Sequence, residues 1–433
     1  MGGRAAQRRR GLPRRLWRGG SAHHRHRRRG RYRQHRRSGH CLVRRSAAGG
    51  RAVKRLVLLG GGHAHVYVLD RLARERRERL VDTEVVLVSP YARQVYSGML
   101  PGWIAGRYAL RDCVLALDVL AALAGVQRVE QACVALDLDA RALCLANGSR
   151  LGFDLLSIDV GPATDIAALP GAAAHALPVR PIETFIAAIE HCLAAYGRGE
   201  TGDLAIVGGG AAGVELAFAL DARLRALGLR GATGSAPAVR LIGAAARPLA
   251  GLPRLLQWRA AALLRARGIE WLGGQRVAEV GAGFVRLADG RELPARHTLL
   301  VTGAAAQPWL AGSGLAVDAG GFVRVSRSLQ SVSHAGVFAA GDCAAYADNR
   351  PKSGVYAVRA GPPLAENLLR ALRGAPLRTW TPQRRALYLI NTADGSALAA
   401  WGALAWWGGW VWRWKDRIDR AFMARFTPTD SSV

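Results

Sequence analysis

The stretch LVLLGGGHAHVYVLD, residues Leu56–Asp70, decides the fold class. Its apolar run ends at Gly60, Gly61 and Gly62 and is followed by a helical pattern, as in the strand, turn and helix of a dinucleotide-binding unit. The slot for a third glycine holds His65 instead. A side chain there would push the helix away from the strand, although Gly60 and Gly62, the two glycines that approach a nucleotide, are both present.

A complete copy of the motif follows in GDLAIVGGGAAGVELAFALDARLRALG, as Gly208-x-Gly210-x-x-Gly213 with Glu215 two residues later. Gly208 permits the tight turn, Gly210 lets a pyrophosphate approach the backbone, and Gly213 lets the helix pack closely on the strand. The helix N-terminus directs free N–H groups and its positive dipole end at the phosphates. Two such units predict an α/β protein with two bound nucleotides, or a duplicated fold in which one site is lost.

An acidic residue closes another apolar strand, in SVSHAGVFAAGDCAAY. Gly341 and Asp342 stand at the end of this strand, immediately before a new helical pattern. A short acid in that place can accept hydrogen bonds from a sugar-alcohol chain while the helix N-terminus faces a phosphate. Its alternative role is an ordinary N-cap, but the two turns upstream favour a ligand contact.

The ribose-binding positions of both units lack their usual carboxylate. Ser89 follows the second strand of the first unit, and Gly243, followed by three alanines, closes the corresponding strand of the second. A serine hydroxyl makes a weaker contact with ribose than a carboxylate does. Arg247 is near enough in sequence to meet a 2′-phosphate, so the pattern is compatible with NADH and with NADPH.

Net charge is concentrated at the start of the chain. The 433 residues carry a formal charge of +30, and residues 1–55 contribute nineteen Arg and one Lys without any acidic residue. Such a segment cannot bury enough apolar surface to offset its chain entropy, so residues 1–51 are predicted to be disordered. They are interpreted as a nucleic-acid-binding arm, a targeting segment or an extension without function. The last is favoured because the whole chain prefers Arg to Lys, so nucleic acid is not expected as a partner.

Cysteine and histidine positions exclude several kinds of site. The six cysteines form no C-x-x-C or other close pair, which argues against a zinc ribbon or a dithiol redox motif. His63 and His65 lie at the start of one helix without an obvious third ligand, so no metal is expected. No stretch of ~18 or more uncharged apolar residues appears, so no spanning helix is expected and a cytoplasmic protein is predicted.

The two turns, LLVTGAAA (residues 299–306) and GVFAAGDCA (residues 336–344), in that order, resemble the pyridine nucleotide-disulfide oxidoreductase superfamily of flavoproteins. The resemblance implies two Rossmann-like domains, the second inserted in the first, plus a small C-terminal region. The implied domains are an FAD-binding domain at 52–180 and 325–385, an NAD(P)H-binding domain at 181–324, and a Trp-rich segment at 386–433. It also implies that FAD contacts Gly60, Gly62, His65, Ser89, Gly161, Gly341 and Asp342, and that NADH or NADPH contacts Gly208, Gly210, Gly213 and Gly303.

A closer resemblance rests on GGGHAHVYVL, LVSPYARQVYSGMLPGWIAG, PKSGVYAVRAGPPLAENL and WRWKDRIDRAFMARF. These segments resemble FAD-dependent oxidoreductases, similar to type II NADH dehydrogenases, that also occur fused to selenide, water dikinase. In that group a histidine in the third-glycine slot is usual. The implied activity is NADH dehydrogenase-like, with hydride passing from NAD(P)H to FAD and electrons passing on to a quinone-type acceptor.

Two other functions stay open at this point. Separated cysteines near a flavin serve sulfide:quinone oxidoreductases, so Cys133, Cys144 or Cys343 is compatible with a reductase or oxidase of sulfur or selenium species. Cys343 is more simply explained as a small buried residue. The chain could also be a flavin-binding or nucleic-acid-binding protein without catalysis.

Several side chains are candidates for the chemistry itself. By resemblance Glu215 lies near the nicotinamide, although it could instead pair with a neighbouring Arg. A helix is expected to begin after Pro363 and to face the flavin, with Lys352 and Arg359 stabilising negative charge there, or serving only as surface charges. Tyr91, Tyr96 and Met99 are expected to form the acceptor-side wall or to pack between domains.

The C-terminal segment is rich in tryptophan beside basic residues. Its tryptophans are Trp401, Trp406, Trp407, Trp410, Trp412 and Trp414. Tryptophan with Arg or Lys on a short helix suits a membrane interface, where a quinone is found, so peripheral contact with the inner face of the cytoplasmic membrane is slightly favoured. Aromatic clusters also fill domain contacts and the interfaces of homodimers, which is the alternative.

Overall fold

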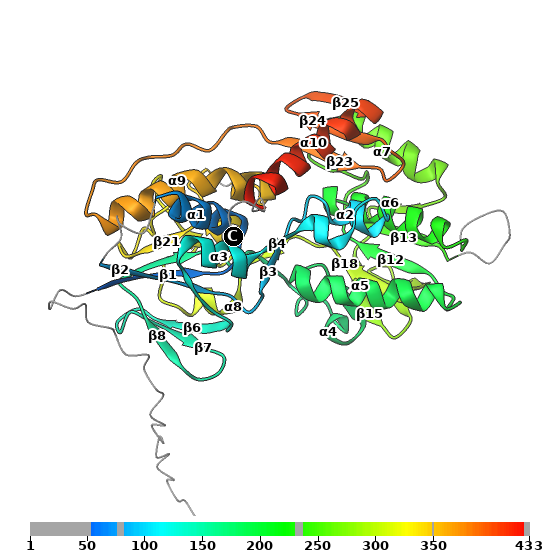
Figure 1. Cartoon of the computed structure of the whole chain (residues 1–433). Coiled ribbons are helices and arrows are strands. Elements are labelled where there is room, and N and C mark those ends of the chain that lie inside the picture. The colour runs from blue at the N-terminus through cyan, green and yellow to red at the C-terminus, as the bar shows by residue number, and fades with distance from the viewer. Residues whose placement is uncertain (1–52, 76–81, 230–236, 349, 428–433) are drawn as a thin grey trace, which may run out of the picture. The chain divides into compact units, whose positions relative to one another are not determined.

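A computed structural model of the chain describes residues 53–75, 82–229, 237–348 and 350–427 (Figure 1). The basic segment predicted to be disordered, residues 1–51, lies outside the described residues.

The first parallel sheet is built around the strand that precedes the first glycine turn (Figure 1). In spatial order its strands are β21 (Val337–Ala339), β9 (Leu155–Ile158), β1 (Lys54–Leu59), β2 (Thr83–Val88) and β5 (Gln127–Val129), and all neighbours are parallel. The central strand β1 is apolar and buried on both faces, as a parallel strand covered on both sides must be. Strand β21 joins this sheet only after the whole second unit.

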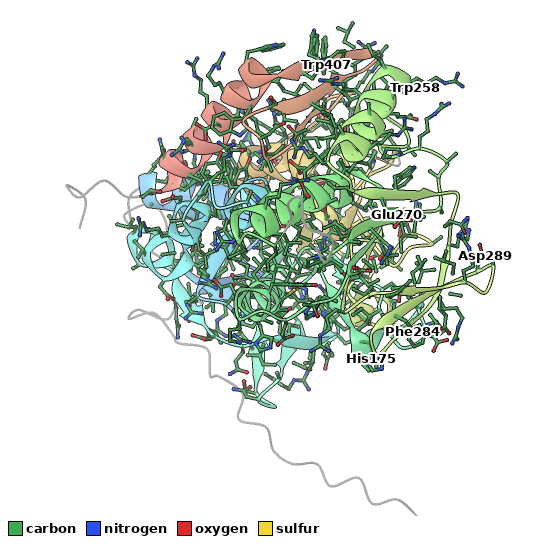
Figure 2. All side chains as sticks on the ribbon, turned by 90° about the vertical axis from the view of Figure 1, so that its right-hand side faces the viewer. His175, Trp258, Glu270, Phe284, Asp289 and Trp407 are labelled. Atoms are coloured by element: carbon green, nitrogen blue, oxygen red, sulfur yellow. The ribbon has the colours of Figure 1, made fainter. Side chains whose placement is uncertain are left out.

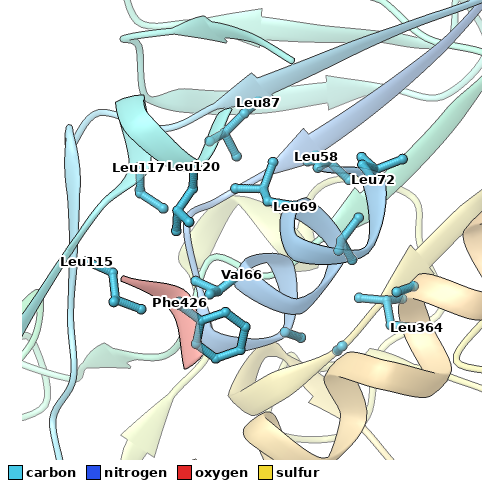
Figure 3. Close-up of a cluster of buried hydrophobic side chains, with 14 of the residues drawn as sticks. Leu58, Val66, Leu69, Leu72, Leu87, Leu115, Leu117, Leu120, Leu364 and Phe426 are labelled. Atoms are coloured by element: carbon cyan, nitrogen blue, oxygen red, sulfur yellow. The ribbon is translucent and has the colours of Figure 1, made fainter. Parts of the chain in front are cut away.

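Helices cover one face of this sheet. They are α1 (His63–Arg74), α3 (Leu117–Ala124) and α9 (Gly354–Leu372). Figure 3 shows part of the resulting core, which contains Leu58 of β1, Leu69 of α1, Leu364 of α9 and Phe426 from the C-terminal region. The other face is covered by the antiparallel strands β6 (Cys133–Asp137), β7 (Ala142–Leu145) and β8 (Arg150–Gly152), with α8 (Pro308–Ala311).

Helix α9 begins earlier than the sequence suggested. The expectation that helix begins only after Pro363 is wrong, because α9 begins at Gly354 and includes both Pro362 and Pro363. Its buried residues recur at helical spacing and pack on α1, which stabilises the helix despite the prolines. The prolines have no N–H, so the carbonyl groups of Val358 and Arg359 lose their usual helical donors.

The second parallel sheet repeats the arrangement. In spatial order its strands are β11 (Ala176–Pro178), β18 (His297–Leu300), β12 (Leu204–Val207), β13 (Val239–Gly243) and β14 (Glu270–Gly273). Its helices are α4 (Ala172–His175), α5 (Ile182–Gly197), α6 (Ala211–Ala226) and α7 (Arg254–Ala266). Because this unit lies in the chain between β9 and β21, the predicted fold class of two Rossmann-like units, the second inserted in the first, is confirmed.

Further short elements complete the described chain. They are β3 (Arg93–Val95) paired with β4 (Val114–Ala116), α2 (Leu100–Ile104), the 3-10 turns η2 (Leu110–Cys113) and η3 (Gly341–Cys343), β10 (Ala163–Thr164) paired with β19 (Ala304–Ala305), the sheet of β15 (Val277–Gly281), β16 (Phe284–Leu287) and β17 (Glu292–Pro294), and β20 (Val323–Arg324) paired with β22 (Ala344–Ala345).

The C-terminal region contacts both units. Its antiparallel strands are β23 (Leu387–Asn391), β24 (Ala397–Trp401) and β25 (Leu404–Gly408), and they lead into α10 (Gly409–Phe426). Ile390 and Leu398 join the core of the second unit, whereas Phe422 and Phe426 at the end of α10 join the core of the first. This region therefore holds α10 against the space between the two sheets.

Candidate functional site

A cavity of about 1770 Å³ lies at the carboxyl ends of strands from both sheets. Single small-molecule sites usually measure about 300–1,000 Å³, so this cavity has room for more than one ligand. Its lining includes both glycine turns, the strand end at Asp342, the N-terminus of α9 and one side of α10. The carboxyl ends of parallel strands are where nucleotides bind in open α/β sheets.

The second turn has the geometry that its three glycines predict. Gly208 has a φ of +132°, and a Cβ there would lie 2.3 Å from the carbonyl oxygen of Val301. A Cβ on Gly213 would lie 1.8 Å from the oxygen of Gly208, so only glycine allows α6 to pack this closely. Within the described residues, the N–H groups of Ala211, Ala212 and Gly213 have no acceptor. These amides border the cavity, as a pyrophosphate site requires.

The first turn accommodates His65 without exposing it. Gly60 has a φ of +97°, as the tight turn requires, and the imidazole of His65 is completely buried behind it. Nδ1 of His65 lies 2.6 Å from the oxygen of Gly60, and Nε2 lies 2.8 Å from Oγ of Ser157. A carbonyl only accepts, so Nδ1 donates to it and Nε2 accepts from the serine. Burial lowers the pKa of His65 to about 4, which keeps the ring neutral.

Ser157 makes room for this imidazole. It pairs with Leu58 in the register between β1 and β9, and the corresponding position in the second unit is Leu299, which pairs with Ile206. A leucine in place of Ser157 would fill the space that the imidazole occupies and could not hydrogen-bond it. One signal of this arrangement is visible in the sequence, a lone serine inside the apolar run LLSID.

Asp159 is a buried carboxylate that the sequence analysis missed. Its Oδ2 accepts hydrogen bonds from the N–H groups of Ala64 and His65, at 2.8 and 3.0 Å, and so caps α1. Burial raises the pKa of Asp159 to about 7. Within the described residues, the N–H groups of Gly61 and His63 keep no acceptor in the chain, so they remain available to a phosphate.

Asp342 lies at the strand end where a sugar-alcohol contact was predicted. Its carboxylate is close to the backbone of Ser353, the N-cap of α9, and to the cations Arg180 and Lys352. Burial raises the pKa of Asp342, and the two cations partly oppose this effect. Lys352 donates from Nζ to the oxygen of Ala344 and lies 4.0 Å from the centre of the Phe322 ring, so it is fixed in place rather than a free surface charge.

The other predicted cofactor residues also border the cavity. Ser89, Gly161 and Gly303 are part of its lining. The hydroxyl of Ser89 already donates to the oxygen of Tyr91, at 3.1 Å. Arg359 borders the cavity from α9 and is exposed, as either of its two predicted roles requires.

Glu215 borders the cavity from the first turns of α6. Its Oε1 accepts a hydrogen bond of 2.7 Å from the backbone N–H of Asn391, so Glu215 is paired with the C-terminal sheet rather than with an arginine. Burial raises the pKa of Glu215 to about 7, although the nearby ammonium group of Lys415 lowers it. The carboxyl group can therefore hold or release a proton near neutral pH.

A buried ion pair on α10 completes this side of the cavity. Nζ of Lys415 donates to Oδ2 of Asp419 at 2.8 Å and to the oxygen of Gly98 at 2.6 Å. The hydroxyl of Tyr96 donates to Oδ1 of Asp419 at 3.1 Å. The carboxylates of Glu215 and Asp419 raise the pKa of Lys415 despite its burial. The signal in the sequence was an acid four residues after a lysine on an amphipathic helix.

Aromatic side chains form the wall beside this ion pair. The ring of Tyr96 stacks on Phe422 with centroids 4.4 Å apart, and the ring of His63 meets Tyr96 edge-on at 5.7 Å. Tyr91 also borders the cavity. Met99 is 1 % exposed and packs in the core of the first unit instead. The wall that was predicted from three residues therefore does not include Met99.

The cysteines are not arranged for redox chemistry of their own. Cys133 borders the cavity, whereas Cys343 is completely buried and Cys144 lies outside the lining. Burial raises the pKa of Cys133 and of Cys343 to about 12, so both are thiols at neutral pH and poor nucleophiles. In the part of the chain that the structure describes, no group of three His, Cys, Asp or Glu side chains is placed to hold a metal.

Comparison with known proteins identifies the family. The family model described as pyridine nucleotide-disulphide oxidoreductase matches residues 54–361, which is most of the chain. The chain therefore belongs to this family of oxidoreductases. An NADH dehydrogenase-like protein of Mycobacterium tuberculosis is 29 % identical over 297 residues, which cover 67 % of this chain and 73 % of that protein. A demethylphylloquinone reductase of Synechocystis is 27 % identical over 366 residues, covering 80 % and 87 %.

Solved structures show the same fold. The sulfide:quinone oxidoreductase of Aquifex aeolicus superposes with a TM-score of 0.71 at 18 % identity and covers 86 % of this chain and 91 % of its own. NDH2 of Plasmodium falciparum, solved in complex with NADH, gives a TM-score of 0.69 at 12 % identity and covers 86 % and 97 %.

Proposed function

We propose that this protein is an FAD-dependent NAD(P)H:quinone oxidoreductase. The observation that carries the proposal is the continuity of one cavity, which is lined by both glycine turns and by the Lys415 and Asp419 pair. A donor on one turn and a flavin on the other would then share a space with an acceptor. The family supports a flavin and a pyridine nucleotide, and the relatives named above support a quinone as acceptor.

The first turn and the strand end at Asp342 suit FAD. The free N–H groups of Gly61 and His63 would bind its pyrophosphate, and Asp342 would bind its ribityl hydroxyls. The amides of the second turn would bind the pyrophosphate of NADH or NADPH. Bound FAD supplies the redox chemistry, because it accepts hydride from the nicotinamide and passes electrons on one or two at a time.

Positive charge from the chain favours this arrangement. The N-terminus of α9 borders the cavity, and Lys352 is held beside it by Ala344 and Phe322. Arg359 is one turn further along α9. A helix N-terminus and two cations stabilise negative charge that develops on a ligand in the cavity.

The acceptor side is where protons are needed. A quinone gains two protons when it is reduced to the quinol, and Tyr91, Tyr96 and Phe422 offer an apolar, aromatic wall on which such a ring can lie. Lys415 holds a proton at neutral pH, and Glu215 holds one for part of the time because its pKa is about 7. These two groups would orient the acceptor and supply its protons.

An exposed aromatic surface suits contact with a membrane, from which a quinone would arrive. It consists of Trp258 on α7 together with Trp401, Leu404, Trp407, Trp410 and Trp414. Figure 2 shows Trp258 and Trp407 at one edge of the protein. Arginines lie over these rings, including Arg259 at 5.5 Å from the centre of Trp407. The contact that we propose is peripheral. In the described part of the chain no helix is long and apolar enough to cross a bilayer.

The proposal is tested with the purified protein under anaerobic conditions. A visible flavin spectrum that bleaches on addition of NADH or NADPH, followed by reoxidation with a short-chain quinone, is the expected result. Reoxidation should survive Cys133→Ser, whereas a sulfur-based mechanism that uses this cysteine would lose it. A folded protein that binds no FAD, or whose reduced flavin does not react with quinones, would overturn the proposal.

Membrane contact is tested separately by sedimentation with anionic vesicles. The double variant Trp407→Ala/Trp410→Ala should sediment less than the unchanged protein. Phe284→Ala is a matched control, because Phe284 also lies under an arginine, Arg286, but on the separate β16 strand. Equal sedimentation of both variants would show that the tryptophans do not bind the vesicles.

A further inference from the structure

The end of β13 is where a Rossmann unit recognises the ribose of its dinucleotide, and its geometry here is unusual. The side chain that normally stands there is a carboxylate, which binds the 2′-hydroxyl of NADH and repels the 2′-phosphate of NADPH. In this chain the position is Gly243, directly beside the second glycine turn. A Cβ on Gly243 would lie 2.5 Å from the indole of Trp271, so no carboxylate side chain fits there.

The indole of Trp271 occupies this space. It stands on β14, and its indole also lies against Gly209, where a Cβ would be 2.4 Å away. Nε1 of Trp271 donates to the oxygen of Ala246 at 3.2 Å, and the N–H of Leu249 donates to the oxygen of Gly209 at 2.8 Å. The loop after β13 is therefore held across the turn by the indole and by the backbone, in a fixed position.

The two segments that meet at this strand end each carry one charged residue, and both are arginines. The loop from Gly243 to Ala250 has one charged residue, Arg247, and the segment that follows β14 contributes Arg276. Gln275, next to Arg276, donates from its N–H to the oxygen of Gly243 at 3.0 Å, which brings the two segments together. Both arginines are exposed, and neither forms an ion pair with any residue that the structure describes; Arg247 lies 4.6 Å from the centre of the Trp258 ring.

Nearby acids do not neutralise these arginines. Glu270 on β14 is paired with Arg240, and Glu279 on β15 is paired with Arg286. A guanidinium group without a carboxylate partner is the usual ligand of a phosphate, because its planar donors match two phosphate oxygens.

We infer that the second unit recognises the 2′-phosphate of NADPH through Arg247 and Arg276, at a strand end from which Trp271 excludes the carboxylate that would select NADH. This inference rests on the proposed function, because it assigns the donor of that same site. Recognition of the adenosine end does not depend on the flavin, so the two proposals can be tested apart.

The experiment measures binding of two adenosine fragments and the rates with two whole donors. The fragment 2′,5′-ADP should bind more tightly than 5′-AMP by about tenfold, by calorimetry on the flavin-loaded protein. The ratio of kcat/KM for NADPH to that for NADH should exceed 1 and should fall at least tenfold in Arg247→Ala/Arg276→Ala. Ala244→Asp, which places an acid on the exposed loop beside Gly243, should lower the same ratio. Arg198→Ala is the control, because this exposed arginine lies at the opposite end of β12 and should leave the ratio unchanged.

The outcomes separate the two proposals. Equal binding of the two fragments, or a ratio that the double variant leaves unchanged, would overturn the inference. If 2′,5′-ADP binds as expected and neither donor reduces the flavin, the inference stands and the proposed function is overturned.

Discussion

The two glycine turns have the same topology and solve the same packing problem in different ways. Gly213 in the second turn lets α6 touch the strand and leaves three amides free. His65 in the first turn is matched by Ser157 where the second unit has a leucine, and by Asp159 where the second unit has Val301. Residues on and directly after the neighbouring strand β9 thus compensate for the missing glycine. As a result, the N–H groups of Ala64 and His65 donate to Asp159 and are not available to a ligand.

The largest effect is expected when a side chain is placed in the second turn, as in Gly213→Val. No serine or aspartate compensates there, so α6 must move away from Gly208, and we expect flavin reduction by NADPH or NADH to fall at least about a hundredfold. FAD should stay bound, which the visible spectrum shows. Gly197→Ala, at the end of α5 where a Cβ meets nothing within 4 Å, should reduce normally. Normal reduction by Gly213→Val would mean that this turn does not bind the donor.

Ser157 on β9 corresponds to Leu299 on β18 of the second unit. The substitution Ser157→Leu should destabilise the protein. The leucine would collide with the buried imidazole of His65 and leave its Nε2 without a donor, which together cost about 3 kcal/mol of unfolding free energy. Adding His65→Gly should restore part of that loss, because the pair then matches Leu299 and Gly213. Urea unfolding measures both effects. If the two losses simply add, the residues are not coupled as described.

The third prediction concerns Asp159→Asn and pH. The folded-state pKa of Asp159 is about 7, raised from 3.8, so between these values the folded protein binds more protons than the unfolded chain. Its contribution to stability is therefore present below pH 4 and lost as the pH rises to 7. Asparagine keeps an oxygen for the N–H groups of Ala64 and His65 without the charge.

The variant should therefore gain stability relative to the unchanged protein as the pH rises from 4.5 to 7.5, by about 3 kcal/mol. Unfolding of both proteins across this range gives the difference directly. Because His65 is present in both, its own titration cancels. A difference that does not change with pH would show that Asp159 is ionised throughout.

The smallest expected effect concerns Tyr67 and Glu215, which occupy corresponding positions in the two units. Tyr67 lies two residues after His65, and Glu215 lies two residues after Gly213. Both border the cavity, but only Glu215 titrates near neutral pH, so Glu215→Gln should remove a step near pH 7 from the pH profile of quinone reduction. The rate at pH 6 should fall about tenfold. Tyr67→Phe should keep the step. A profile that Glu215→Gln leaves unchanged would assign the step to another group.

The sequence was sufficient to predict the fold where local pattern and topology agree. The apolar strand, the glycine positions and the following helix identify each unit without any knowledge of distant contacts, and Asp342 was placed at its strand end in the same way. Local pattern was misleading for α9, because Pro362 and Pro363 suggested a late start, whereas packing of the preceding turns on α1 maintains the helix.

Residues that act across long separations could not be predicted in this way. Asp159 caps a helix that lies some ninety residues earlier, and Lys415 contacts Gly98 from the other end of the chain. Neither partner is visible in a window of sequence. Asp159 did leave a trace, a polar residue at the end of an apolar run, and Lys415 left another, an acid four residues later on the same helix. Such traces suggest a buried polar group but do not show what it contacts.

The position of α10 has a consequence for biosynthesis. Of the described elements it is the last to leave the ribosome, yet Lys415, Asp419 and Phe422 form one side of the cavity, and Phe426 packs in the core against Tyr67 of α1. Both nucleotide-binding halves can thus emerge and begin to fold while one flank of their shared chamber is still open to water. A ligand that binds during translation would therefore bind to an incomplete cavity. Helix α10 would then cover one side of the cavity with the ligand already bound.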